Sequence, residues 1–374
     1  MTFLDEPHVP GHGPIPSPIC LVGEAPGGTE LVYKRPFVGE AGQELGRILQ
    51  DANLGPLDTR EGKGYRRHYY TTNVFKIKPP DTHRKRNDIS EFFVSRTNES
   101  ACLDLPPHRP GNFLRSELRP MVDGLVPELV GVGAKVVIAL GNTALWALLG
   151  YSKISSYVGT IHPATSSRPF IVLPTYHPSA ILHQWPLRST MVANLLKVED
   201  CLRQAGATDS LNGRGTDSSF RPTIKTSPTI SEIEAFAERA FNADVVAVDV
   251  ETRFGQIRTV GFSITPDSAF IIPFWEPPAG SYWPTIDGEV RAWKAVKRIL
   301  SSRRSTKIFH NGSFDIQYLW RLHGIPTYGP IEDTMLAHHA MEPELPKTLG
   351  GLAAVYLNMP EWKTMRARSE KDEE

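Results

Sequence analysis

The sequence predicts an α/β protein with two domains. Its 374 residues exceed what a single hydrophobic core usually supports. Short apolar runs alternate with amphipathic segments, and this alternation is typical of parallel strands connected by helices. One stretch, 205–228, is rich in Gly, Ser, Thr and Asp and has the composition of a linker. We therefore expect domains at 15–204 and 229–374, with a flexible arm at 1–14.

The first half of the chain contains four apolar runs with the length of a buried strand. They are Ile19–Val22, Tyr69–Lys78, Lys135–Leu140 and Phe170–Leu173. The expected connections are helices at 41–49, 114–130, 142–149 and 187–204 and a long polar loop at 81–112. Gly, Pro, Asn or His residues follow the strand runs, and parallel sheets bind ligands beyond the carboxyl ends of their strands. The sequence therefore predicts a site at those ends.

The second half has the signals of another α/β unit. The expected elements are strands at 245–248, 258–264, 269–274 and 307–309 and helices at 287–302 and after 312. Asp249 and Glu251 follow the first of these strands, and Asp315 lies on the last helix. Carboxylates thus stand where the strands of the second unit end.

Composition excludes few classes of protein. The formal net charge is zero, which argues mildly against nucleic-acid binding but is compatible with one basic face. The three cysteines, Cys20, Cys102 and Cys201, form no C-x-x-C pair, so we expect no disulfide framework and a cytoplasmic protein of a prokaryote or of a phage-infected cell. No apolar run approaches the roughly 20 residues that span a bilayer, and the first residues lack a secretion signal. No membrane partner is expected.

The strand ends of the first domain supply the residue types that a pocket for an extruded base requires. Such a pocket needs an aromatic face for stacking and an amide that reads the Watson–Crick edge. It also needs a donor for the departing base, because cleavage of the N-glycosidic bond leaves negative charge on the base. Phe37, Asn73 and His177 offer these three groups, and Glu24 adds a carboxylate.

Four ordered segments resemble the motifs of family 4 and family 5 uracil-DNA glycosylases. They are GEAPGGTELVYKRPFVGEAGQEL (23–45), TNVFKIKPP (72–80), LGNTALWALLG (140–150) and LPTYHPSAIL (173–182). Any one of them alone would be weak, but their order and spacing match over about 190 residues. The resemblance implies a three-layer αβα domain with a parallel sheet that hydrolyses the N-glycosidic bond of a flipped uracil in DNA.

The resemblance also implies a role for each matching residue. Phe37 stacks on the uracil, Asn73 reads its polar edge, and His177 donates to a uracil oxygen in the transition state. Glu24 helps to set the attacking water or the sugar. The turn after the first strand and the turn after the last are expected to hold the flanking phosphates through Gly23, Ala25, Pro26, Gly27, Pro178 and Ser179.

The chain departs from this family in two ways. Family 4 enzymes usually carry four cysteines for an iron–sulfur cluster, whereas this chain has three and none before Ile19, so we predict no cluster and no other cofactor for this domain. The family is usually short where this chain has its segment 81–112. The basic run in that segment either contacts DNA phosphates or is only a solvated insertion, and its residues are Arg84, Lys85 and Arg86.

The carboxylates of the second domain suit metal ions. A strand has a side-chain period of two, so Asp249 and Glu251 point to the same side. Oxygen ligands are preferred by Mg²⁺ and Mn²⁺, and two such ions can activate water and stabilise a leaving 3′ oxygen. Asp315 is the third candidate ligand.

Three segments resemble the 3′–5′ exonuclease domain of family A DNA polymerases. They are DVET (249–252), HNGSFD (310–315) and a segment at 333–357. The resemblance implies a ribonuclease H-like (DnaQ-like) fold with a mixed sheet and makes Asp249, Glu251 and Asp315 the metal ligands. The family's last motif, a Tyr followed four residues later by an Asp, is missing, because Arg368 stands four residues before Asp372. We expect either a fragment of a longer protein that continues into a polymerase, or an impaired exonuclease.

Together these features predict a DNA repair or replication protein that excises uracil and carries an incomplete exonuclease-like domain. Its expected partner is DNA, single- or double-stranded, with a polymerase domain or replication proteins as further partners. Two alternatives remain. The first domain could recognise uracil or a modified pyrimidine without cutting, as part of a viral replication polymerase. Otherwise metal-dependent 3′–5′ trimming could be the only activity.

Overall fold

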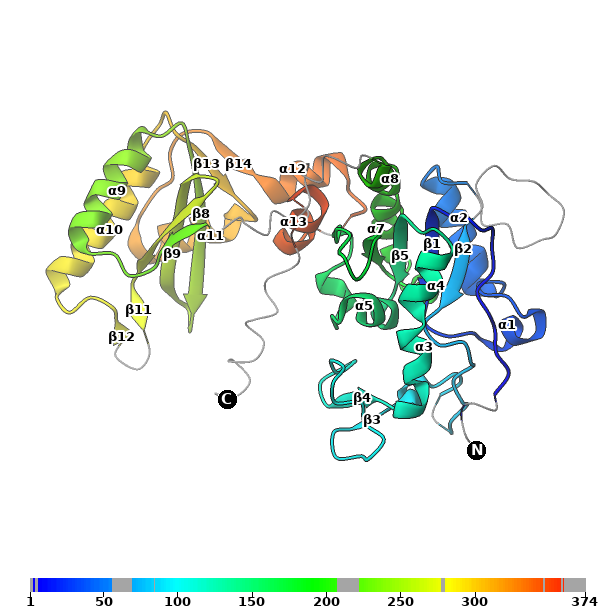
Figure 1. Cartoon of the computed structure of the whole chain (residues 1–374). Helices are drawn as coiled ribbons and strands as arrows, with labels where there is room; N and C mark the ends of the chain where they lie inside the picture. Colours follow the sequence, from blue (N-terminus) through cyan, green and yellow to red (C-terminus); the bar gives the residue numbers. More distant parts are fainter. Residues whose placement is uncertain are drawn as a thin grey trace. The chain divides into compact units, whose positions relative to one another are not determined.

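The computed structural model describes residues 3, 6–55, 69–83, 85–206, 222–276, 280–345, 347–357 and 359. The described residues form two compact units, one within 1–216 and the other within 217–343, and short stretches after residue 343 are divided between them (Figure 1). Both units combine helices with a sheet, so the predicted α/β class is confirmed. No helix in these ranges is long and apolar enough to cross a membrane.

The first unit contains a four-stranded parallel sheet, as predicted. Its strands are β1 (Ile19–Gly23), β2 (Tyr70–Asn73), β5 (Val136–Leu140) and β6 (Ile171–Thr175), in the order β2-β1-β5-β6. Every residue of these strands is buried, which explains their continuous apolar runs. Gly23 is aligned with Asn73, and Leu140 with Thr175. The carboxyl ends of the four strands therefore meet at one edge of the sheet.

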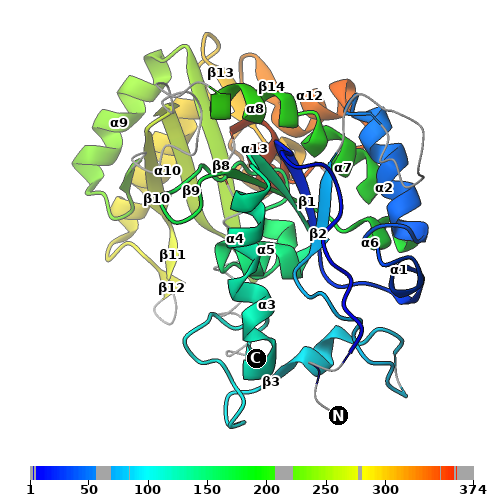
Figure 2. The same ribbon diagram turned by 45° about the vertical axis from the view of Figure 1, so that its right-hand side comes forward.

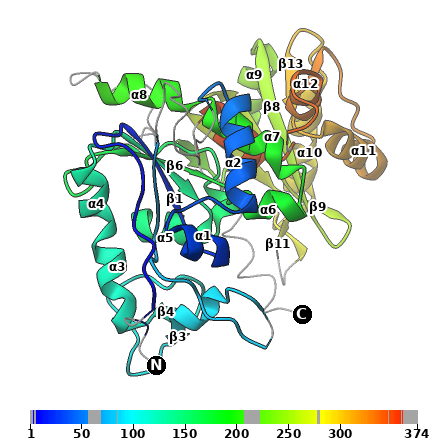
Figure 3. The same ribbon diagram turned by 90° about the vertical axis from the view of Figure 1, so that its right-hand side faces the viewer.

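Helices cover both faces of this sheet and make three layers. One face packs against α3 (Arg119–Asp123), α4 (Leu125–Gly131) and α5 (Asn142–Leu149). The other packs against α2 (Glu40–Asp51), α6 (Pro178–His183), α7 (Leu187–Leu195) and α8 (Val198–Gly206). Figure 3 shows α3 and α4 on one side of the sheet and α2, α6 and α7 on the other. Alternate residues of each strand serve the two cores, as Cys20 and Leu21 of β1 illustrate.

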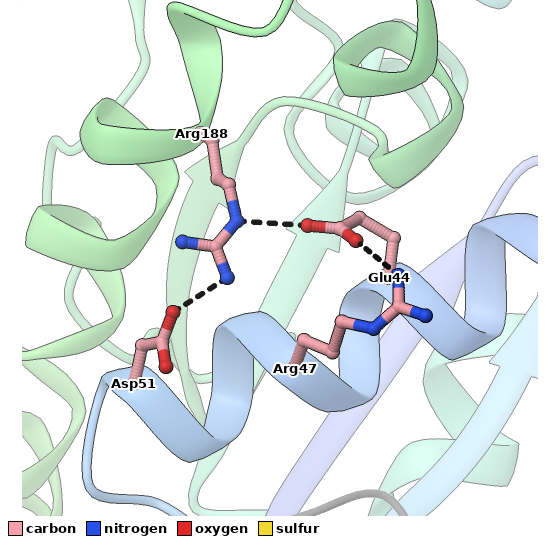
Figure 4. A network of polar contacts seen from close by, with 4 residues as sticks. All are labelled: Glu44, Arg47, Asp51 and Arg188. Carbon is pink, nitrogen blue, oxygen red and sulfur yellow. Dashed lines mark hydrogen bonds and ion pairs between the residues drawn. The ribbon is translucent and has the colours of Figure 1, made fainter.

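An ion-pair network joins α7 to α2 (Figure 4). Arg188 Nε donates to Glu44 Oε1 at 2.8 Å, and its Nη2 donates to Asp51 Oδ2 at 2.5 Å. Arg47 Nη1 donates to the second oxygen of Glu44 at 2.9 Å. The Glu44 carboxylate is buried, and two guanidinium groups offset the cost of taking its charge out of water.

Two segments are more ordered than the sequence predicts. The predicted arm lies along β2 and the residues after it. His12 exchanges backbone hydrogen bonds with Thr71 of β2 in both directions, and Val9 N donates to Lys76 O beyond the end of the strand. The unpaired edge of β2 supplies these partners. The predicted polar loop at 81–112 contains η2 (Ile89–Phe92) and an antiparallel pair formed by β3 (Phe93–Ser95) and β4 (Asn112–Leu114). Four of its residues, Ile89, Phe92, Phe93 and Cys102, enter the core.

Other element boundaries differ in detail. The strand expected at 69–78 ends at Asn73. The helix expected at 114–130 divides into η3 (Ser116–Leu118), α3 and α4, and the helix expected at 187–204 divides into α7 and α8. Gly124 lies between α3 and α4. The remaining short helices of the unit are α1 (Gly28–Tyr33) and η4 (Ile154–Ser156).

The second unit contains a six-stranded mixed sheet, which confirms that prediction. Its order is β14-β13-β8-β9-β10-β7. The strands are β7 (Thr223–Lys225), β8 (Val245–Arg253), β9 (Gln256–Thr265), β10 (Ser268–Pro273), β13 (Thr306–Phe309) and β14 (Ile331–Asp333). β8, β9 and β10 run antiparallel, whereas β13 pairs with β8 and β14 in parallel. β7 lies inside the segment predicted as a linker and pairs with β10, so the ordered unit starts earlier than expected.

Helices and one hairpin complete the second unit. The helices are α9 (Ile230–Asn242), α10 (Ile286–Leu300), α11 (Gly312–His323) and α12 (Thr334–Met341). The hairpin joins β11 (Trp275–Glu276) and β12 (Gly280–Ser281). Figure 2 shows α9 and α10 side by side against the sheet. One further helix, α13, spans Leu349–Leu357, and its residues from Gly350 on belong to the first unit.

Candidate functional sites

Gly23, Asn73 and Phe37 meet at the carboxyl edge of the first sheet. A Cβ atom at Gly23 would lie 2.4 Å from Asn73 Oδ1 and 2.7 Å from Phe37 Cζ. The amide and the ring thus both approach the end of β1, where only glycine leaves room for them. Phe37 has a left-handed backbone with φ of 58°, which is uncommon for a bulky residue and marks a conformation held by its surroundings.

Two contacts hold Phe37 in this conformation. The Glu30 carboxylate accepts hydrogen bonds from Phe37 N and Gly27 N at 2.5 Å each, and burial raises the pKa of this carboxyl. From the other side α2 approaches so closely that a Cβ atom at Gly42 would lie 1.7 Å from Phe37 O. The Gly27 amide, which the sequence assigned to phosphate binding, is therefore already occupied by Glu30.

Asn73 is 2% exposed, and its Nδ2 atom has no hydrogen-bond partner in the described part of the chain. A buried donor without an acceptor costs about 1–3 kcal/mol. The backbone here is fixed, because Lys76 Nζ donates to Asn73 O at 2.8 Å and forms an ion pair with Glu128 at 2.6 Å. The Asn73 amide is therefore a rigid donor that lacks an acceptor.

His177 caps the N-terminus of α6 and lies just beyond the carboxyl end of β6. Its Nδ1 atom accepts a hydrogen bond from Ser179 N at 3.2 Å and lies 2.7 Å from Ser179 Oγ. Burial lowers the pKa of His177, although the negative charge of Glu24 works against this shift. The neutral ring with Nδ1 as acceptor carries its proton on Nε2. Its centroid lies 6.2 Å from that of Phe37.

Pro178 and Ser179, the two residues after β6 that were expected to hold phosphate, offer it no free backbone donor in the described structure. Pro178 has no N–H group, and the Ser179 amide donates to His177. Among the residues expected to bind phosphate, the amides of Gly23 and Ala25 remain as candidates, because Pro26 also lacks an N–H group. Ser179 instead contacts the His177 ring through its backbone amide and its hydroxyl.

Glu24 is held by residues that sequence reasoning did not select. Thr143 Oγ donates a short hydrogen bond to Glu24 Oε2, and His108 Nε2 lies 3.0 Å from the same hydroxyl. Thr143 belongs to the third motif, whereas His108 comes from the segment predicted as a loop. A single histidine between prolines carries no sequence signal for this contact.

The basic run of the first unit lies in an exposed loop. Lys85 and Arg86 are exposed, and Arg84 lies outside the described residues. Asp81 accepts from Lys78 Nζ and from Asn87 N at 2.8 Å each, and the charge of Arg86 also acts on it. The loop thus has a defined shape whose cations are partly balanced by its own carboxylates.

The three cysteines do not form a ligand set for an iron–sulfur cluster. All three are buried and free, and Cys20 and Cys102 belong to the core on one face of the sheet while Cys201 belongs to the core on the other. Burial raises the pKa of the Cys20 and Cys201 thiols to about 12, so both favour the neutral form that binds metal poorly. These residues do not fit the cluster.

In the second unit, Asp249 and Glu251 lie on the face of β8 opposite the buried Val248 and Val250, as the period of a strand predicts. Asp315 of α11 is buried, and its Oδ1 accepts from Val250 N at 3.0 Å. Burial raises the pKa of Asp315 to about 7, and the charges of Asp249 and Glu251 add to this shift. The carboxylates of Asp249 and Glu251 are therefore close enough to disfavour the negative charge of Asp315.

The donor atoms are of the right type for Mg²⁺ or Mn²⁺, but their arrangement is not a finished metal site. No group of three or more His, Cys, Asp or Glu side chains among the described residues has an arrangement that could hold a metal ion. One oxygen of Asp315 is already committed to the β8 backbone. Arg368 and Asp372, which do not match the last exonuclease motif, lie outside the described residues.

Asp333 has a structural role that the sequence left undefined. Its carboxylate accepts from four backbone amides, those of Asn311 (3.1 Å), Gly312 (2.7 Å), Met335 (2.9 Å) and Leu336 (3.3 Å). Burial opposes its ionisation, but these amides hold the pKa of Asp333 below its usual range. One side chain thus caps both α11 and α12 and fixes the helix that carries Asp315.

Asp333→Ala is expected to lower the free energy of unfolding of the second unit by about 1–2 kcal/mol, because four amides lose their acceptor. Hydrogen exchange at Gly312 and Met335 in the full chain would measure this. Asp287→Ala is the matched control, since that exposed side chain in the first turn of α10 has an ion pair of 3.9 Å with Arg291. Equal exchange in the two variants would contradict the assigned role.

The fold and these side chains define an α/β protein whose first unit gathers an aromatic ring, an amide and an imidazole at its strand ends and whose second unit has neighbouring carboxylates. Residues 10–198 match the family model "Uracil DNA glycosylase superfamily", and residues 224–372 match the model "3'-5' exonuclease". The first match covers half of the chain, so the chain belongs to the uracil DNA glycosylase superfamily. Both resemblances drawn from the motifs are confirmed.

The relatives of the first unit carry the same family name. Type-4 uracil-DNA glycosylases of Thermotoga maritima and Pyrobaculum aerophilum are 28% and 30% identical over 200 and 188 residues, which cover 53% and 50% of this chain and 84% and 79% of those proteins. The Saccharolobus solfataricus enzyme is 26% identical over 197 residues, or 52% of this chain and 76% of that protein.

Two of the solved structures with a likeness to the chain are an exoribonuclease and a protein that was solved with bound Mg²⁺. Escherichia coli RNase D aligns with a TM-score of 0.30 and 19% identity, over 39% of this chain and 36% of that one. Brucella melitensis NrnC with bound Mg²⁺ aligns with a TM-score of 0.27 and 21% identity, over 37% of this chain and 62% of that one. The chain therefore spans less than two thirds of either solved chain.

Proposed function

We propose that the first unit hydrolyses the N-glycosidic bond of a uracil flipped out of DNA. The observation that carries this proposal is the unpaired, buried Nδ2 donor of Asn73, which stands beside Phe37 at the strand edge that His177 and Glu24 share. A pyrimidine oxygen would supply the missing acceptor. Membership of the glycosylase superfamily supports the same reaction.

Each side chain has a defined task in this reaction. The uracil stacks on Phe37, and Asn73 Nδ2 donates to its polar edge. As the bond between the sugar C1′ and the base nitrogen breaks, the Nε2–H group of His177 donates to the oxygen on which negative charge accumulates. Glu24 stabilises the positive sugar and takes a proton from the water whose oxygen bonds to C1′.

A neutral His177 suits this task. The neutral ring donates a hydrogen bond to the leaving base anion without first losing a proton to it, and the Ser179 amide keeps Nδ1 from being the donor. The stacking partner and the donor are also held apart from each other, with 6.2 Å between the ring centroids of Phe37 and His177.

The second unit is proposed to be a 3′–5′ exonuclease module, on the basis of its family match and its carboxylates. Asp249, Glu251 and Asp315 would hold Mg²⁺ or Mn²⁺, which would activate water and stabilise the leaving 3′ oxygen. We retain 15–204 and 229–374 as the functional domains and DNA as the shared substrate. Lys85 and Arg86 are proposed contacts to the DNA backbone because both are exposed.

The test is release of uracil by the purified full chain. Single- and double-stranded oligonucleotides with one uracil should yield an abasic product, and Asn73→Ala and His177→Ala should suppress it. Tight binding to uracil-containing DNA without an abasic product would establish a recognition module instead. Degradation from a 3′ end that Asp249→Ala abolishes, with no abasic product, would leave exonuclease activity alone.

A further inference from the structure

A chain of hydrogen bonds runs from Glu24 into the segment that departs from the family. Thr143 Oγ donates to Glu24 Oε2, and His108 Nε2 lies 3.0 Å behind it. Thr143 is fully buried and His108 is 3% exposed. Water therefore does not compete for these contacts, which strengthens each of them.

The direction of the chain follows from the number of protons. An ionised carboxylate only accepts hydrogen bonds, so Thr143 must use its single proton to donate to Glu24. The Thr143 oxygen can then only accept, and the group that faces it is His108 Nε2. Burial lowers the pKa of His108 to about 4, with a smaller contribution from the charge of Arg109, so the ring is neutral near pH 7. The chain thus requires the Nε2–H form of His108.

Asn142 competes for the same ring nitrogen. Its Nδ2 atom lies 3.2 Å from His108 Nε2, and its Oδ1 accepts from Lys153 N at 2.6 Å and from Ile154 N at 3.2 Å, which fixes the amide orientation. Asn142 could donate only to a bare Nε2. The contact to Thr143 is shorter and ends on a charged group, and charge-assisted hydrogen bonds are the stronger ones. The contact with Thr143 therefore determines that the proton of the His108 ring lies on Nε2.

The inserted segment holds the His108 ring rigidly. The ring stacks on Phe93 with a centroid distance of 4.3 Å and an interplanar angle of 15°, and it meets Trp146 edge-on at 5.7 Å. Trp146 Nε1 donates to Pro106 O at 2.7 Å, which ties the segment to α5. A ring fixed on both sides can transmit its orientation to Thr143.

We propose that His108 and Thr143 are positioning residues for Glu24, with His108 Nε2–H holding the Thr143 hydroxyl and Thr143 holding Glu24 Oε2, so that the second carboxylate oxygen is left for the attacking water. This inference rests on the proposed glycosylase function. It assigns a role to the segment between β3 and β4 that is separate from any contact of the basic loop with DNA.

The position of the proton can be tested without activity. Histidine-selective ¹⁵N NMR of the full chain distinguishes the two neutral forms of a ring, and loss of a signal in His108→Gln assigns it among the 12 histidines. The wild-type ring should carry its proton on Nε2. In Thr143→Val the Asn142 amide is the polar partner of that nitrogen that remains among the described residues, so the proton should move to Nδ1. A wild-type ring protonated on Nδ1, or no change in Thr143→Val, would overturn the chain.

Kinetics test the consequence for catalysis. Thr143→Val should lower the single-turnover rate of uracil release by about ten- to a hundredfold, the scale of one hydrogen bond to a charged group. Its affinity for uracil-containing DNA should change by less than about twofold, because Glu24 does not grip the base. Thr143→Ser and His108→Gln, which keep a hydroxyl and an N–H donor, should restore most of the rate, whereas His108→Leu should not.

Thr190→Val is the matched control. It makes the same replacement at a buried threonine whose hydroxyl has no partner among the described residues, so the rate should not change. An unchanged rate in Thr143→Val with an active wild type would refute the positioning role. If the wild type releases no uracil but the NMR results are as expected, the glycosylase proposal fails while the hydrogen-bond chain stands.

Discussion

Gly23→Ala is expected to lower the rate of uracil release by about a hundredfold or more, because misplacing reacting groups by about 1 Å costs that much. The new methyl group would stand 2.4 Å from Asn73 Oδ1 and 2.7 Å from Phe37 Cζ, so both must move. A single substitution thus displaces the reading amide and the stacking ring together. Its effect should exceed that of Asn73→Ala or His177→Ala in the same single-turnover assay.

Gly28→Ala separates this effect from a general effect of the methyl group. Gly28 is the first residue of α1 and follows Gly23 by five positions. No atom lies within 4 Å of the position that its Cβ would take. This variant should release uracil at the wild-type rate. Thermal unfolding of both variants should confirm that the fold is retained. A Gly23→Ala protein as active as Gly28→Ala would show that Phe37 and Asn73 do not form the base pocket.

Much of this site could be predicted from sequence because parallel strands share one carboxyl edge. Glu24 and His177 come from distant segments, yet each comes directly after a predicted apolar strand or within a few residues of it, whereas Asn73 lies inside the predicted strand 69–78 and is the last residue of β2. Such runs need only local patterns, and the parallel alignment then brings their ends together, as the register of Gly23 with Asn73 shows. The side-chain period of a strand, which is also a local pattern, correctly placed Asp249 and Glu251 on one face of β8.

The supporting contacts could not be predicted, because they depend on tertiary packing. His108 reaches Thr143 across 35 positions of sequence from a segment with little periodic pattern. Glu30 looks like an ordinary polar residue of a short helix, but its carboxylate binds two backbone amides of the pocket. Two of the amides expected to bind phosphate, those of Gly27 and Ser179, already have acceptors, which a local sequence does not reveal.

The carboxylates of the second unit illustrate a different limit. Their spacing in the sequence predicts a shared face, but a metal site also requires free oxygen atoms at the correct distances. One oxygen of Asp315 already accepts a hydrogen bond from Val250 N of β8. The negative charges of Asp249 and Glu251 also disfavour the ionised form of Asp315. Without a cation this arrangement costs stability, as expected where function rather than folding selects the residues.

Asp315→Asn is therefore expected to stabilise the second unit at alkaline pH. The folded pKa of Asp315 is about 7, above the usual value of 3.8, so the folded state holds this proton more tightly than the unfolded state does. The stability that this group contributes is fully present below about pH 4 and is lost as the pH rises through 7. At pH 8 the variant should gain up to roughly 4 kcal/mol, because it keeps the acceptor for Val250 N without the charge.

Hydrogen exchange of the β8 amides in the full chain, between pH 5 and 8 and without divalent ions, would measure this difference within the second unit alone. Exchange corrected for its intrinsic pH dependence should show stability falling with pH in the wild type and remaining level in Asp315→Asn. Mg²⁺ should restore the wild type at pH 8 and have little effect on the variant, because a cation can replace the proton between the carboxylates. Parallel pH curves for the two proteins would mean that Asp315 ionises normally and that the carboxylates do not interact.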